Sequence, residues 1–114
     1  VDASFPDSVL RDTIVCPYNE PEHAAALIER HASELAAVIV EPVLGSMGMV
    51  AATKAFLETL RKATARHGIV LIFDEVITGI AKTGAMFAAQ KYGVTPDIIC
   101  CGKGISSVWY RWAS

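Results

Sequence analysis

Three short apolar runs alternate along the chain with segments in which apolar side chains recur at helical spacing. The apolar runs cover residues 36–43, 69–75 and 97–101. Their continuous apolar character predicts strands that are buried on both faces of a sheet. Helices are expected over residues 20–32, 53–67 and 85–92. Because each strand follows a helix, the pattern predicts an α/β fold with a parallel sheet and right-handed crossovers.

Polar residues, prolines and glycines mark the expected ends of these elements. Asn19 followed three residues later by Glu22 predicts a capping box at the start of the first helix. Pro42 ends the first strand, and Gly68 ends the second helix after a turn rich in cations. Residues 1–18 contain two prolines and are expected to be an irregular lead.

The number of predicted strands is small for a parallel sheet. Three parallel strands leave two edges without a neighbour, which sheets of this kind normally avoid. No repeat, charge block or flexible linker divides the chain. We therefore expect residues 1–114 to be a fragment of one larger α/β domain.

Composition and charge remove several classes of function. Hydrophobic residues make up 53 % of the chain, which excludes an intrinsically disordered protein. A net charge of −2 gives no reason to expect nucleic acid or an anionic membrane surface as a partner. No apolar stretch approaches the length of a membrane span, and no signal peptide is recognised.

Cysteine and histidine usage argues against disulfide and metal chemistry. The three cysteines are an odd number, two are adjacent, and no C-x-x-C pair occurs. The three histidines lie in helical segments among charged neighbours, where solvated side chains are expected. We predict no metal site and a reducing, cytoplasmic environment.

Polar groups follow the predicted strands, where ligands bind in open parallel sheets. Glu41 follows the first strand, Asp74 and Glu75 follow the second, and Lys103 follows the third. Asp74 and Glu75 are consecutive, so their side chains are expected on opposite faces. A carboxylate at the end of an apolar strand needs a cation or several donors, and a poorly solvated lysine becomes nucleophilic. From these residues alone, turn-forming acids and a solvated lysine remain the commoner interpretation.

Two nucleotide-binding patterns are incomplete. Gly79 and Gly84 have the spacing of a phosphate-binding loop, but Ala85 follows where that loop requires a lysine. The segment from Gly102 to Ser107 resembles a dinucleotide fingerprint without its third glycine. A nucleotide-binding domain is therefore the least favoured function.

Four segments in order resemble a known family. They are AVIVEPV at 37–43, LIFDEVITG at 71–79, YGVTPDI at 92–98 and GKG at 102–104. Together they are similar to the class III pyridoxal-phosphate-dependent aminotransferases of fold type I, over about residues 20–107. The resemblance implies that the chain is part of the large cofactor-binding domain of such an enzyme.

The resemblance also implies roles for five residues. Lys103 matches the lysine that holds the aldehyde of pyridoxal 5'-phosphate as a Schiff base, and Asp74 matches the carboxylate that pairs with the pyridine nitrogen. Val76 matches the side chain that packs against one face of the ring, although core packing explains a valine there equally well. Glu41 and Glu75 match acids near the site, with supporting roles.

The implied reaction moves an amino group between an amine or amino acid and a keto acid or aldehyde, in a homodimeric cytoplasmic enzyme. An aminomutase of the glutamate-semialdehyde type is an alternative that residues 45–48 favour, whereas residues 82–84 favour a transaminase. A non-catalytic remnant of the fold is a third possibility.

The chain departs from the family pattern in three respects. The segments that hold the cofactor phosphate and contribute groups from a partner subunit are not among these 114 residues. Ala81 and Lys82 stand where the family often has glycine and arginine, and residues 108–114 form an atypical tail with both tryptophans. We expect the isolated chain to be catalytically inactive or nearly so, and to associate through its sheet edges.

Overall fold

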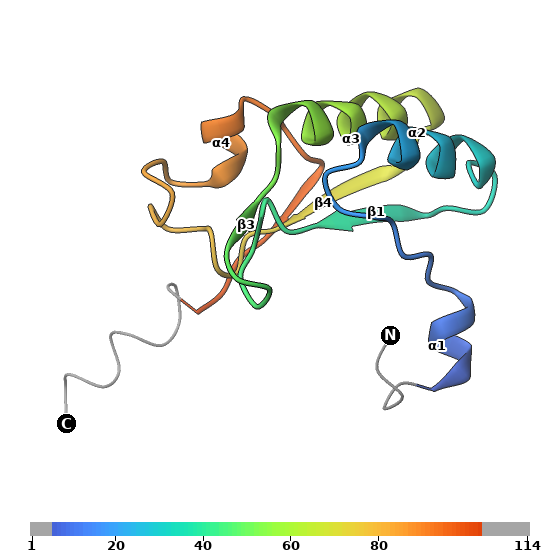
Figure 1. Ribbon diagram of the computed structural model, residues 1–114, viewed down its shortest axis with the longest axis horizontal. Helices are drawn as coiled ribbons and strands as arrows, with labels where there is room; N and C mark the ends of the chain where they lie inside the picture. Colours follow the sequence, from blue (N-terminus) through green and yellow to red (C-terminus); the bar gives the residue numbers. More distant parts are fainter. Residues whose placement is uncertain (1–5, 104–114) are drawn as a thin grey trace.

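A computed structural model describes residues 6–103 of the chain. It contains a three-stranded parallel sheet with the strand order β1-β4-β5 (Figure 1). The strands are β1 (Ala37–Val40), β4 (Val70–Asp74) and β5 (Ile98–Cys100). The helices before and between them are α2 (Pro21–Arg30), α3 (Lys54–His67) and α4 (Ala88–Tyr92). The predicted α/β class and helix–strand order are confirmed; Gly104, Ser107 and the tail at 108–114 lie outside the described residues.

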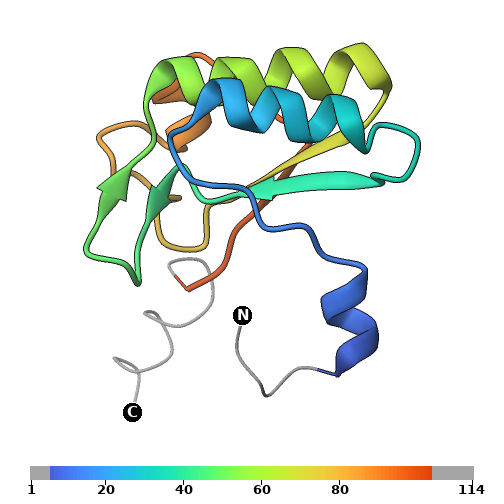
Figure 2. The same cartoon turned by 45° about the vertical axis from the view of Figure 1, so that its right-hand side comes forward.

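The hydrophobic core lies between the sheet and the helix pair α2 and α3. These two helices run side by side over one face of the sheet (Figures 1 and 2). Leu71 and Phe73 of β4 and Leu57 of α3 have no exposed surface. Burying side chains of this size contributes about 1.5–3 kcal/mol each to folding. The core therefore fixes β4 beneath α3 and places the end of β4 at a defined point.

The opposite face of the sheet carries a row of isoleucines. Ile39, Ile72 and Ile98 are aligned across the three strands by the parallel register. Ile39 is 64 % exposed and Ile98 is 48 % exposed. The prediction that the strands are buried on both faces is therefore wrong for the described residues, because α2 and α3 cover only the other face.

The helix ends follow the sequence signals at α3 but not at α2. Thr53 precedes α3 and its Oγ1 accepts a hydrogen bond from the Phe56 N–H, while Gly68 ends the helix with a φ of 67°. Helix α2 instead begins with Pro21 after Glu20, without a side-chain cap. The Asn19 side chain instead donates a hydrogen bond to the Ala51 carbonyl and accepts one from the Thr53 N–H, so the predicted capping box is wrong.

Three further details differ from the sequence prediction. A hairpin of β2 (Val43–Leu44) and β3 (Val50–Ala51) follows β1, where only a loop was expected. A short helix α1 (Asp7–Arg11) lies in the lead that was expected to be irregular, and α4 begins only at Ala88. Within residues 6–103, no helix has the length and apolar character needed to cross a bilayer.

Candidate functional site

Asp74 and Lys103 both lie at the carboxyl end of the sheet, where the neighbouring strands β4 and β5 end. Asp74 is the last residue of β4 and pairs in register with Cys100 of β5, three positions before Lys103. The alternation of β4 places Asp74 on the same face as Ile72, away from the helices. Lys103 is exposed and has a φ of 39°, a positive value that residues with a side chain rarely adopt. The structure therefore brings the predicted acid and lysine to one edge of the sheet.

Val76 lies next to Asp74 and beside Gly102. Its N–H donates a hydrogen bond of 3.1 Å to Asp74 Oδ1, which holds the carboxylate against the turn that follows β4. A Cβ atom built on Gly102 would lie 3.8 Å from both γ-methyl groups of Val76. Val76 thus packs beside the residue that precedes Lys103, and an acid, an apolar side chain and an amine share one corner of the fold.

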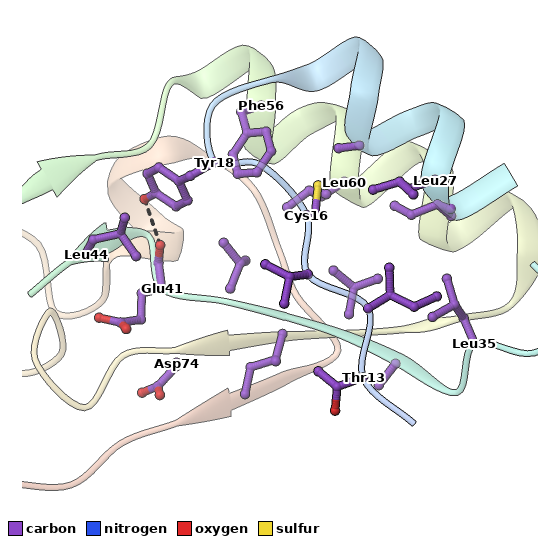
Figure 3. Close-up of a pocket in the computed structure, with 18 of the residues that line it drawn as sticks. Thr13, Cys16, Tyr18, Leu27, Leu35, Glu41, Leu44, Phe56, Leu60 and Asp74 are labelled. Carbon is purple, nitrogen blue, oxygen red and sulfur yellow. Dashed lines mark hydrogen bonds between the residues drawn. The ribbon is translucent and has the colours of Figure 1, made fainter. Parts of the chain in front are cut away.

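Glu41 lies at the end of β1 and shares a cavity with Asp74. The cavity has a volume of about 570 Å³ and extends along β1 below α2 and α3 (Figure 3). Glu41 Oε2 accepts a hydrogen bond of 3.1 Å from the Gly45 N–H at the start of the hairpin. The cavity lining includes Asp74 and Glu41, whereas Lys103 and Val76 are not part of it.

Tyr18 was not singled out from the sequence, yet it connects the lead to this corner. Its hydroxyl donates a hydrogen bond of 2.8 Å to the Glu41 carbonyl, drawn in Figure 3, and its ring meets Phe56 edge-on. Burial, with smaller contributions from Tyr92 and Glu41, raises the pKa of this hydroxyl to about 12. The hydroxyl therefore stays protonated and serves as a donor that holds the end of β1. A tyrosine in a segment with prolines gives no periodic signal that could have revealed it.

Glu75 lies on the opposite face from Asp74, as the sequence predicted from their consecutive positions. Its side chain has no exposed surface. Its Oε1 accepts hydrogen bonds from Thr78 Oγ1 at 3.0 Å and from the Ala88 N–H, and its Oε2 accepts one from the Ala89 N–H at 3.2 Å. The carboxylate is thus held by the first turn of α4, on the helix side of the sheet.

The loop between β4 and α4 contains unusual backbone conformations. Ile80 and Ala81 have φ values of 61° and 63°, in the left-handed region that side chains with a Cβ rarely adopt. Ala81 is one of the positions at which the sequence departs from the family pattern. The glycine of that pattern would adopt this positive φ without strain, because it has no Cβ.

A second polar cluster, at the opposite end of the strands, aligns β5 with β4. Asp97 Oδ2 accepts hydrogen bonds from the Leu71 N–H at 2.7 Å and from Arg61 Nη1 at 3.0 Å. The Leu71 hydrogen bond, followed by Arg61, holds the pKa of Asp97 below its usual value. Within residues 6–103, no group of three potential ligands could hold a metal ion.

Comparison with known sequences gives a consistent set of relatives. The sequence model of the family described as Aminotransferase class-III matches residues 3–111. An omega-aminotransferase of Caulobacter vibrioides is 50 % identical over 100 residues, which is 81 % of this chain and 23 % of that protein. A glutamate-1-semialdehyde 2,1-aminomutase of Bacillus licheniformis is 46 % identical over 100 residues, 88 % of this chain and 23 % of its own length.

Comparison with solved structures agrees. A structure described as a transaminase with PLP bound has a TM-score of 0.84 and 36 % identity, covering 94 % of this chain and 25 % of that chain. An omega-transaminase from Sphaerobacter thermophilus has a TM-score of 0.80 and 43 % identity, covering 90 % of this chain and 23 % of that chain. The chain therefore spans about a quarter of the length of the relatives that it matches.

Proposed function

The chain belongs to the class III aminotransferases, and we propose that it forms the part of such an enzyme that carries the cofactor lysine and the acid for the cofactor's ring nitrogen. The family relation indicates pyridoxal 5'-phosphate as the cofactor. The observation that supports the proposal is the register of β4 and β5, in which Asp74 pairs with Cys100, three positions before Lys103.

The residues at this corner fit the cofactor by their chemistry. When bound, pyridoxal phosphate supplies an aldehyde and a ring that accepts electrons. Lys103 offers a primary amine for the aldehyde, and Asp74 offers a carboxylate for the protonated ring nitrogen at a neighbouring strand end. Val76 offers an apolar surface beside Gly102, the residue before Lys103.

Each residue then has a distinct proposed task. Lys103 Nζ would hold the cofactor through its aldehyde, and the same amine would move a proton at the reacting carbon of the substrate. Asp74 keeps the ring nitrogen protonated by accepting its hydrogen bond. Glu41 supports the site indirectly, because its carboxylate holds the N–H of Gly45 and thereby the base of the hairpin.

The complete enzyme would move an amino group between an amine or amino acid and a keto acid or aldehyde. A homodimer in the cytoplasm is part of the same proposal. The cytoplasmic location is supported by the three free cysteines, which suit a reducing compartment. The isomerisation of glutamate 1-semialdehyde is a second candidate, because relatives with that name are 45–51 % identical to the chain.

Absorption spectroscopy of the 114-residue chain tests the cofactor assignment. Addition of pyridoxal phosphate is expected to produce a visible band that Lys103→Ala abolishes and Lys62→Ala, on the exposed side of α3, retains. Borohydride reduction and peptide mass mapping should place the added mass on Lys103. A band that persists in Lys103→Ala, or no band in the parent chain, would show that the assignment is wrong and would favour a non-catalytic remnant.

The two reactions are separated with the complete polypeptide. A transaminase consumes a keto acid as it converts an amino donor, whereas an aminomutase converts glutamate 1-semialdehyde without an external acceptor. Measuring keto-acid consumption for both kinds of substrate therefore decides between them.

A further inference from the structure

Glu75 holds the main chain next to Asp74 at several points. Its N–H donates a hydrogen bond of 2.8 Å to the Cys100 carbonyl of β5, and its own carbonyl accepts one of 2.8 Å from the Gly79 N–H. Its carboxylate is fixed by Thr78 and by the first two N–H groups of α4. A buried carboxylate with three donors has one favourable orientation, because leaving those donors unpaired is costly.

The same anchor determines where Asp74 points. Consecutive residues of an extended chain direct their side chains to opposite faces, so a Glu75 held on the helix face directs Asp74 to the open face. The turn that follows is tight, since a Cβ atom on Gly79 would lie 2.7 Å from the Glu75 carbonyl oxygen. Within this turn the Val76 N–H holds Asp74 Oδ1.

We propose that Glu75 is a positioning residue for the cofactor site: it fixes the Asp74 carboxylate toward the ring nitrogen of pyridoxal phosphate from the opposite face of the sheet. This inference rests on the proposed function. Glu75 acts through the backbone of residues 74–76 and makes no contact with the cofactor. Glu75 was predicted to support the site, and it does so from the helix face of the sheet, opposite to Asp74.

A pair of ligands that differ only at the ring nitrogen tests this role. Pyridoxal phosphate is compared with its carbocyclic analogue, in which a CH group replaces that nitrogen, by titrating the Lys103-dependent band. A charge-assisted hydrogen bond from the protonated ring nitrogen to Asp74 predicts that the parent chain prefers pyridoxal phosphate by about 10-fold to 100-fold. Asp74→Ala is expected to remove the preference without affecting the affinity for the analogue.

Glu75→Gln is expected to reduce the preference to about threefold or less, on the same scale. The amide retains the size of the side chain but directs an NH₂ group at an N–H of α4 in place of an acceptor oxygen. Thr78→Val removes one donor to the carboxylate and leaves Glu75 itself in place, so it should reduce the preference partially. Circular dichroism of each variant verifies that it is folded.

Gln90→Ala is the matched control. Gln90 Oε1 accepts a hydrogen bond of 3.2 Å from the Phe87 N–H, so its loss loosens the same end of α4 without involving Glu75. This variant should retain the full preference for pyridoxal phosphate.

The outcomes separate the inference from the function on which it rests. Glu75→Gln could weaken binding of both ligands equally and retain the preference. This result would show that Glu75 only stabilises the fold, and it would overturn the inference alone. A parent chain that forms the band but shows no preference would overturn the inference and the task assigned to Asp74. A parent chain without the band would overturn the proposed function itself.

Discussion

The left-handed backbone at two positions leads to a pair of opposite predictions about stability. Gly68 ends α3 with a φ of 67°, and Ala81 has a φ of 63° in the loop after β4. Nothing lies within 4 Å of a Cβ atom built on Gly68, so Gly68→Ala introduces backbone strain without a steric clash. Ala81→Gly removes the same strain from a residue that already carries a Cβ.

The magnitude follows from two opposing effects. A Cβ in the left-handed region costs about 1–2 kcal/mol, and the lower conformational entropy of alanine in the unfolded chain offsets about 0.4–1 kcal/mol of that cost. Gly68→Ala should therefore lower the free energy of unfolding by about 0.5–1 kcal/mol, and Ala81→Gly should raise it by a similar amount. The hydrogen bonds of both residues are made by backbone groups, so both substitutions leave them in place.

Urea denaturation followed by circular dichroism measures both effects. With a slope of about 1–3 kcal/mol per molar urea, the midpoint should fall by a few tenths of a molar unit for Gly68→Ala and rise similarly for Ala81→Gly. Gly48→Ala, at a φ of 82° with open space around it, should behave like Gly68→Ala. An unchanged midpoint for Gly68→Ala, or a lower midpoint for Ala81→Gly, would refute the reasoning.

Three further predictions concern charge, packing and completeness. The Leu71 N–H and Arg61 hold the pKa of Asp97 in the folded chain below its ordinary value of 3.8. The carboxylate therefore stabilises the fold above pH 3.8, and this stabilisation is lost as the pH falls through the folded-state pKa. Asp97→Asn should lower the urea midpoint at pH 7, and its difference from the parent chain should shrink below pH 3.8. Gly45→Ala places a Cβ against the Ile77 side chain, so either that side chain or the hairpin must shift and the thermal midpoint should fall, whereas Gly48→Ala meets no such contact. The purified chain, verified by mass, should show no measurable transamination and should self-associate at high concentration in light scattering; robust turnover or a strict monomer would contradict this expectation.

The sequence was sufficient to predict the sheet and its strand-end residues because both depend on local patterns. Apolar runs separated by amphipathic segments determine the helix–strand order, and the order determines which strand ends meet. The period of two along β4 correctly separated Asp74 from Glu75. Gly68 at the end of α3 followed from the residue's conformational freedom, which does not depend on the rest of the fold.

Other features depended on contacts between distant segments. Asn19 has the residue type and spacing of a helix cap, but its side chain reaches Ala51 and Thr53, more than 30 positions away. The burial of Ile39 was overestimated. An apolar side chain favours a buried position, but it is buried only where another element covers it, and no helix in the described part of the chain covers this face of the sheet. Glu75 has no local signal that distinguishes a ligand-facing acid from one held by a helix, so its partners on α4 became visible only in three dimensions.

The ladder between β4 and β5 has a consequence for how this region tolerates change in length. The spacing of neighbouring strands, about 4.8 Å, sets the lateral separation of Asp74 from the β5 chain, whatever the course of the intervening loop and α4. Insertions at residues 82–86 can therefore accumulate during evolution without separating the carboxylate from the amine. A single residue deleted between Cys100 and Lys103 would shift the amine relative to its partner strand, so natural variation in length should concentrate in the crossover and avoid that short segment.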